Sequence, residues 1–194
     1  MLNRLLLVLT GPSGCGKTTL YQRFLENFPE TRRVITTTTR LPRPGEIPQV
    51  DYFFQTKEEF LNHCQKGEFL EHAQVYGHEY GVSKASLLQK KYETHDLIMS
   101  LDVQGAKTFQ NRFDPVSLMR RLVTIFMEPE SLETLKQRLL TRGTDDAPTI
   151  QKRLQTAEKE LRMAAQFDYR FCSQNREHDW RCLQHIYFAE KMRS

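Results

Sequence analysis

Residues 11–18 read Gly-Pro-Ser-Gly-Cys-Gly-Lys-Thr, which completes the pattern G-x-x-x-x-G-K-[ST]. An apolar run at residues 5–9 precedes this stretch and predicts a buried strand, while a helical pattern follows it at residues 18–27. Backbone N–H groups of a glycine-rich turn that opens onto a helix N-terminus form a cradle for a polyphosphate. The order of strand, loop and helix therefore predicts a nucleoside triphosphate site.

Two side chains of this loop have distinct expected roles. Lys17 is expected to reach the β- and γ-phosphates, and the hydroxyl of Thr18 is expected to complete the coordination shell of Mg²⁺. The predicted triphosphate site comprises Gly11, Pro12, Ser13, Gly14, Cys15, Gly16, Lys17, Thr18 and Thr19.

Strand and helix patterns alternate over much of the chain. Further buried strands are predicted at residues 97–101, 122–127 and 169–172. Helical spacing of apolar residues predicts helices at residues 103–112, 131–142, 149–166 and 179–192, and the last of these places Trp180 in the core. This alternation is typical of a three-layer α/β/α core with a parallel sheet covered by helices.

Two segments interrupt the alternation. Residues 34–86 are rich in Thr, Arg, Pro, Gly and aromatic residues and contain one clear helical pattern, at residues 57–66, so they predict an inserted lobe of short strands and turns. Residues 129–157 carry arginines on helical faces and are a second candidate insertion. We therefore expect a single domain with its core at about residues 1–33, 87–128 and 158–194, a lobe at 34–86 and a lid at 129–157. Such insertions commonly close over substrates and exclude water.

Composition narrows the class of protein. The chain has 194 residues, a formal net charge of +4 and no basic run interleaved with aromatic residues, so no nucleic-acid surface is expected. No stretch approaches the roughly 20 apolar residues of a membrane span. The four cysteines lack metal-ligand spacing. Reduced thiols and a cytoplasmic location are expected, and no protein partner is implied.

A second phosphate site is predicted at the start of the lobe. Arg40 and Arg43 are three residues apart and separated by a proline, and guanidinium groups bind phosphate oxygens in a bidentate manner. Tyr52 and Tyr80 offer hydroxyl donors for the same ligand.

The motifs GPSGCGKTT (11–19), TTTRLPRPGE (37–46), DYFF (51–54), FLEHA (69–73), YG (80–81) and LDVQGA (101–106) occur in one order along the chain. This ordered set resembles the guanylate kinase family over nearly the whole sequence. The resemblance implies that the phosphate loop binds ATP and that the lobe binds GMP, and dGMP as well. It implies phosphorylation of GMP to GDP with release of ADP, by in-line transfer under a closing lid and with Mg²⁺ as the required ion.

Site residues follow from matching each motif position. By resemblance, the acceptor phosphate is held by Arg40, Arg43, Tyr52 and Tyr80, and the base is recognised by Glu71 and Asp102, with Thr36 where a serine is usual. A carboxylate such as Glu71 suits guanine, because it accepts from the adjacent N1–H and N2–H donors that adenine lacks. The residues expected to stabilise the transferring phosphoryl group are Lys17, Arg43, Arg138, Arg142 and Arg153.

Three departures from the family pattern affect this interpretation. Val82 replaces the hydroxyl residue that normally follows the tyrosine-glycine pair, which predicts weaker base recognition. On a strand, the hydroxyl of Ser83 would point to the opposite face. Ser100 replaces an acidic residue two positions before Asp102, which predicts weaker Mg²⁺ retention or slower chemistry. Ser173 replaces an asparagine that contacts adenine, so the preference for the donor base stays open.

Two other functions remain possible from the sequence. Some related kinases that phosphorylate ribose 1,5-bisphosphate carry a valine at the position of Val82, but they lack the full TTTR-x-PR-x-GE and FLEHA segments. Non-catalytic guanylate-kinase-like modules bind phosphorylated peptides, but they have lost a working phosphate loop, whereas Gly11, Gly16, Lys17 and Thr18 are all present here.

Overall fold

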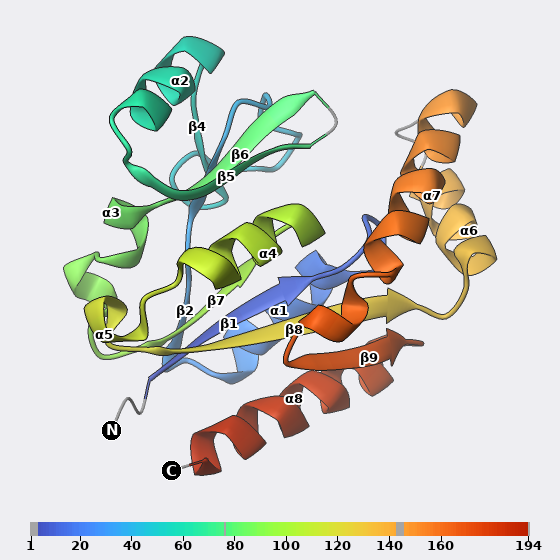
Figure 1. Ribbon diagram of the computed structural model, residues 1–194. Coiled ribbons are helices and arrows are strands. Elements are labelled where there is room, and N and C mark those ends of the chain that lie inside the picture. The colour runs from blue at the N-terminus through green and yellow to red at the C-terminus, as the bar shows by residue number, and fades with distance from the viewer. Residues whose placement is uncertain (1–3, 76, 143–145, 194) are drawn as a thin grey trace.

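A five-stranded parallel sheet forms the centre of the computed structural model, which describes residues 4–75, 77–142 and 146–193 (Figure 1). The strand order is β2-β7-β1-β8-β9, and every neighbouring pair is parallel. The strands are β1 (Leu5–Thr10), β2 (Thr31–Arg33), β7 (Asp96–Ser100), β8 (Arg121–Pro129) and β9 (Tyr169–Ser173). The predicted α/β class with a parallel central sheet is therefore confirmed.

The central strand β1 is apolar on both faces because helices cover both sides of the sheet. Leu5, Leu7 and Leu9 pack in one apolar cluster with residues of α1 (Lys17–Asn27) and α8 (Arg176–Met192). Leu6 and Val8 pack on the other face with residues of α4 (Val103–Arg112). Alternation along one strand thus builds both halves of the core.

A second, four-stranded sheet with the order β4-β3-β6-β5 stands above the central one. Its strands are β3 (Thr36–Thr38), β4 (Tyr52–Phe54), β5 (Phe69–Val75) and β6 (His78–Ser83). One face is covered by α2 (Lys57–Gln65), where the Phe60 ring stacks on Phe69 at 4.5 Å between centroids. The residues predicted to bind the acceptor lie on the opposite face, because Thr36 pairs with Tyr52, and Thr38 with Tyr80.

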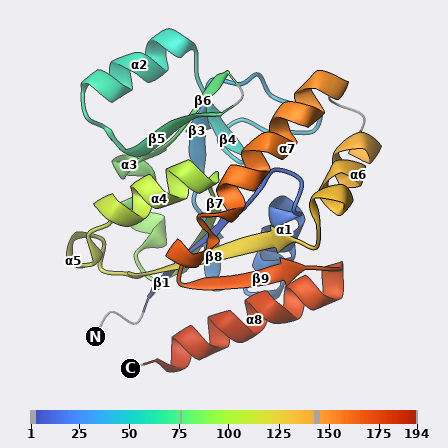
Figure 2. The ribbon, with the colours of Figure 1, turned by 45° about the vertical axis from the view of Figure 1, so that its right-hand side comes forward.

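Two antiparallel helices stand opposite this sheet, α6 (Leu132–Arg142) and α7 (Ala147–Leu161). Figure 2 shows α7 leaning toward the second sheet, with the loop after β1 at its foot. Leu135 and Leu139 of α6 and Ile150 and Ala157 of α7 join the cluster that contains α1. Both helices are therefore packed onto the core beside the phosphate loop.

The structure corrects several details of the sequence-based prediction. The helix expected at residues 149–166 is α7 followed by a separate 3₁₀ turn, η2 (Ala164–Gln166). After this turn, the Phe167 ring packs against Phe126 of β8, with the ring centroids 5.4 Å apart. No local pattern predicted the edge strand β2 or the short elements α3 (Lys84–Leu87), η1 (Lys90–Tyr92) and α5 (Pro115–Leu118).

Candidate functional site

The loop between β1 and α1 has the backbone conformation that its glycines predict. Gly11, Gly14 and Gly16 all have positive φ angles, of 133°, 99° and 94°. A Cβ atom at Gly11 would lie 2.3 Å from the carbonyl oxygen of Met127. Only glycine therefore lets the loop pass this close to the end of β8.

Lys17 bends back over this loop at the first residue of α1. Its Nζ donates hydrogen bonds to the carbonyl oxygens of Gly11, at 2.6 Å, and Pro12, at 3.0 Å. Burial lowers the pKa of Lys17, while the charges of Glu160 and Asp102 oppose that shift. The ammonium group is thus held at the mouth of the phosphate loop.

Glu160 on α7 is a site residue that the sequence analysis missed. Burial raises the pKa of Glu160 to about 7; Lys17 opposes this shift and Asp102 adds to it. Arg153, seven residues earlier on the same helix, donates from Nη1 to the Ser13 hydroxyl at 3.3 Å. A spacing of seven residues places both side chains on one face of a helix, which is the signal that could have identified Glu160.

Arg138 is the other predicted lid arginine that lies beside the loop. Its Nη1 donates to the Ser173 hydroxyl at 3.4 Å, and its Nη2 donates to the Gln174 carbonyl at 3.2 Å. Arg142 ends α6, but its side chain lies outside the described part of the structure. Two of the three predicted lid arginines are thus placed next to the phosphate loop.

The predicted acceptor-phosphate residues gather at one end of the four-stranded sheet of the lobe (the lobe sheet). Arg40 forms a two-pronged ion pair with Glu46, at 3.0 and 2.9 Å, and its guanidinium carbon lies 5.5 Å from the centroid of the Tyr52 ring. Tyr52 and Tyr80 lie edge to face at 6.3 Å. Burial disfavours the charge of Arg40, but hydrogen bonds with Glu46 and Tyr80 outweigh it and raise the pKa.

Arg43 differs from Arg40 because its side chain is exposed. Its backbone is anchored through an N–H that donates to Glu46 Oε2 at 2.8 Å. Glu46 therefore holds both arginine segments, a role that the sequence analysis did not assign to it.

Two predicted base-recognition carboxylates converge between the two phosphate sites. Asp102 caps α4 by accepting from the Gly105 N–H at 2.9 Å. A Cβ atom at Gly105 would lie 2.6 Å from Glu71 Oε1 and 2.9 Å from Asp102 Oδ2. Glu71 is 1% exposed, and its Oε1 has no hydrogen-bond partner among the described residues. A buried acceptor without a partner is costly unless a ligand supplies a donor.

The same burial perturbs the ionisation of both groups. Burial, and then the charge of Asp102, raise the pKa of Glu71 from 4.5 to about 8. Burial also raises the pKa of Asp102, against the hydrogen bonds that its carboxylate accepts from the backbone. Perturbed groups in close proximity are typical of functional sites.

This shift predicts how the stability of the protein depends on pH. Between pH 4.5 and about 8, Glu71 is ionised in the unfolded chain and protonated in the folded one, so the free energy of unfolding falls as pH rises. Glu71→Gln removes this contribution. We expect the variant to gain stability relative to the parent protein between pH 5.5 and pH 8, as measured by denaturant midpoints. Parallel profiles for the two proteins would contradict the assignment.

The three departures from the family pattern also have defined positions. Val82 is fully buried and lies directly across from Glu71 in the β5–β6 ladder. The Ser83 hydroxyl lies on the opposite face, as predicted, and caps α3 by accepting from the Ser86 N–H. Ser100 ends β7 next to β1, and Ser173 is buried at the end of β9.

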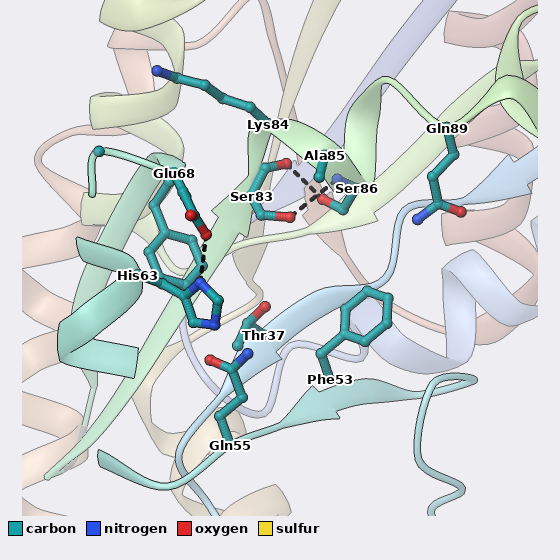
Figure 3. A pocket seen from close by; sticks show the side chains of 12 residues that line it. Thr37, Phe53, Gln55, His63, Glu68, Ser83, Lys84, Ala85, Ser86 and Gln89 are labelled. Atoms are coloured by element: carbon teal, nitrogen blue, oxygen red, sulfur yellow. Dashed lines mark hydrogen bonds and ion pairs between the residues drawn. The ribbon is translucent and has the colours of Figure 1, made fainter. Parts of the chain in front are cut away.

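A cavity of about 560 Å³ lies on this opposite face of the lobe sheet, away from the predicted site (Figure 3). Thr37, Phe53 and Ser83 point toward it from three strands, and the His63–Glu68 ion pair borders it. None of the predicted site residues that the structure describes lines this cavity.

Within residues 4–75, 77–142 and 146–193, no helix combines the length and the apolar character needed to cross a bilayer.

Comparisons with known proteins agree with this geometry. The family model described as guanylate kinase matches residues 3–189. Guanylate kinase of Desulfitobacterium hafniense is 39% identical over 85% of this chain and 80% of its own length, and that of a Wolbachia from Brugia malayi is 42% identical over 84% and 82%. The crystal structure of guanylate kinase from Anaplasma phagocytophilum superposes with a TM-score of 0.77 at 29% identity, over 98% of this chain and 88% of that one. The chain therefore belongs to the guanylate kinase family.

Proposed function

We propose that the chain binds ATP at the phosphate loop and GMP on the face of the lobe sheet that α2 does not cover. A phosphoryl group then passes from ATP to GMP by in-line transfer. The reaction is the ATP-dependent phosphorylation of GMP, which yields GDP and ADP. The observation that carries this assignment is the buried carboxyl group of Glu71, which lies with the half-buried Asp102 around Gly105. Asp102 of this pair also interacts electrostatically with Lys17 of the phosphate loop, so base recognition and the donor site adjoin.

The predicted site residues fall into two groups, one for each substrate. Arg40, Arg43, Tyr52 and Tyr80 would hold the acceptor phosphate, and Thr36, Glu71 and Asp102 would contact the base. On the donor side, Lys17, Arg138, Arg142 and Arg153 would stabilise the charge that spreads over the transferring group. The acceptor is itself an ionised phosphate, so positioning, and not a strong general base, carries the catalysis.

A divalent ion fits the donor side of the site. Thr18 is the second residue of α1 and is exposed, and the carboxylates of Asp102 and Glu160 both interact with the neighbouring Lys17. Hydroxyl and carboxylate oxygens are the ligands that Mg²⁺ prefers. We propose that Thr18 holds Mg²⁺ together with the phosphates, where the ion would neutralise charge on the β- and γ-oxygens.

We also propose which segments form the lid, the acceptor lobe and the core. We assign residues 129–157 as a lid, residues 34–86 as the acceptor lobe and the rest as the core. The contact from Arg153 to Ser13 supports this assignment, since α7 already reaches the phosphate loop. A cytoplasmic location is proposed as well, and the four free thiols support it.

An acceptor screen tests the proposed function. ADP release would be measured with Mg·ATP against GMP, dGMP, AMP, UMP, CMP and ribose 1,5-bisphosphate. We expect turnover with GMP and dGMP, and little with the other acceptors. Turnover with the sugar phosphate would overturn the assignment of the base site, and binding of ATP without any turnover would indicate a non-catalytic module.

Val82→Thr is expected to strengthen recognition of GMP. Threonine has nearly the same volume as valine, and the substitution places a hydroxyl directly across from Glu71. One further hydrogen bond to the base is expected to lower the KM for GMP by roughly tenfold, as measured in the coupled assay. The matched control is Val123→Thr, which buries a hydroxyl on β8 and should leave this KM unchanged. An unchanged KM in Val82→Thr would show that the base does not reach this strand.

A further inference from the structure

A buried carboxylate in the first turn of α8 lies behind the donor site. Asp179 is 8% exposed, and both of its oxygens accept hydrogen bonds. Oδ2 accepts from the Ser173 hydroxyl at 2.7 Å, and Oδ1 accepts from the Gln174 N–H at 3.0 Å. The His178 ring also approaches Oδ1, at 3.3 Å from Nδ1. Asp179 thus fixes the last residue of β9 and the residue after it.

These are the two residues that hold Arg138. The guanidinium group donates to the Ser173 hydroxyl and to the Gln174 carbonyl, at 3.4 and 3.2 Å. Figure 2 shows the two supporting elements together, with α6 above the end of β9 and the start of α8 next to it. One carboxylate therefore positions both hydrogen-bond acceptors of a predicted catalytic arginine.

Hydrogen-bond directions at Ser173 make this arrangement specific. Its hydroxyl has one hydrogen and lies 2.7 Å from the Asp179 carboxylate but 3.3 Å from the Cys15 carbonyl of the phosphate loop. The shorter, charge-assisted bond to Asp179 takes the hydrogen. The lone pairs of Ser173 Oγ are then left to accept from Arg138.

We propose that Asp179 is a positioning residue that acts through Ser173 and Gln174 to hold the Arg138 guanidinium beside the phosphate loop. This inference rests on the proposed role of Arg138 in phosphoryl transfer. It also gives Ser173 a function in this chain, in place of the contact to adenine expected of the asparagine usual at that position.

Asp179→Asn tests the inference because it preserves shape while it replaces one acceptor oxygen with a donor. We expect kcat with ATP and GMP to fall by about tenfold, the size expected for loss of one charge-assisted hydrogen bond, and the KM for GMP to stay within twofold. The matched control is Glu177→Gln, which removes an exposed carboxylate from the same turn and should leave both constants unchanged. A change in the KM for GMP alone would overturn the inference.

A double-mutant cycle with Arg138→Ala separates positioning from a structural role. If Asp179 acts through Arg138, adding Asp179→Asn to Arg138→Ala should change kcat by less than twofold. The same tenfold loss in both backgrounds would overturn the inference while leaving the role of Arg138 intact. An unchanged kcat in Arg138→Ala alone would overturn that proposed role, and the inference with it.

Ser173→Ala provides a second variant if Asp179→Asn fails to fold, which thermal unfolding would reveal. It deletes the hydroxyl between Asp179 and Arg138 and leaves the carboxylate bonded to the Gln174 N–H. We expect a smaller loss of kcat that also disappears in the Arg138→Ala background. A loss that persists there would overturn the inference.

Discussion

Replacing Lys17 by alanine is expected to lower kcat for the reaction of ATP with GMP by about 10²–10³-fold, the usual cost of removing one preorganised electrostatic group from a transition state. Lys17 Nζ is held by the carbonyl oxygens of Gly11 and Pro12 at the mouth of the loop. Its pKa is lowered by burial, so a charge partly stripped of water would face the phosphates of bound ATP. Steady-state kinetics with varied ATP and GMP would measure the loss.

The matched control for this prediction is Lys84→Ala. Lys84 begins α3 and its side chain is exposed, on the far side of the lobe sheet from the proposed acceptor site. Its removal should leave kcat unchanged. If Lys17→Ala kept more than a tenth of the parent kcat, the phosphate loop would not hold the reacting phosphates as proposed.

The sequence predicted the core because its signals are local. The buried strand at residues 5–9, the glycines after it and the helix that follows are all determined by neighbouring residues, and the structure has β1, the loop and α1 in this order. The edge strand β2 carries the residues Thr-Arg-Arg, which have no apolar pattern. Its conformation is set by pairing with β7, which lies more than sixty residues away along the chain.

Side chains of the candidate site were likewise predicted only where a local motif contains them. Motifs identified Arg40, Glu71 and Lys17 as residue types, but they did not identify the groups that hold them. Glu46 pairs with Arg40 at 2.9 Å within one loop, only six residues along the chain, but an irregular loop has no periodic pattern from which the pair could be predicted. Glu160 was missed because its importance comes from its interaction with Lys17, on a distant part of the chain. The spacing from Arg153 places Glu160 on the same helix face, but the approach of that face to Lys17 depends on tertiary packing, which no local pattern contains.

Glu71→Gln is expected to reduce discrimination in favour of GMP. At pH 8.5, where the carboxyl group of Glu71 is mostly ionised in the parent protein, it offers two acceptors to the adjacent N1–H and N2–H donors of guanine. Glutamine keeps one acceptor but turns an N–H₂ group toward a donor, and such a mismatch typically costs about 1–3 kcal/mol. The kcat/KM for GMP should therefore fall by roughly ten- to a hundredfold, while that for AMP stays the same or rises.

Two further measurements distinguish loss of the contact to the base from a general loss of activity. The KM for ATP should not change, because Glu71 lies on β5, across Asp102 from the phosphate loop. The matched control is Glu58→Gln, an exposed carboxylate in α2 of the same lobe, which should preserve the ratio of GMP to AMP turnover. Equal losses for GMP and AMP in Glu71→Gln would show that this side chain does not contact the base.

The pH dependence of GMP use provides an independent check on the same residue. The pKa of Glu71 in the folded protein is about 8, so the fraction in the carboxylate form rises between pH 6.5 and pH 8.5. Only this form accepts from both guanine donors, which means that kcat/KM for GMP should increase with pH over this range and level off above it. Glu71→Gln cannot titrate, and the increase should be absent from the variant. If the variant kept the same pH profile as the parent, a different group would control binding of the base, and the neighbouring Asp102 would be the next residue to test.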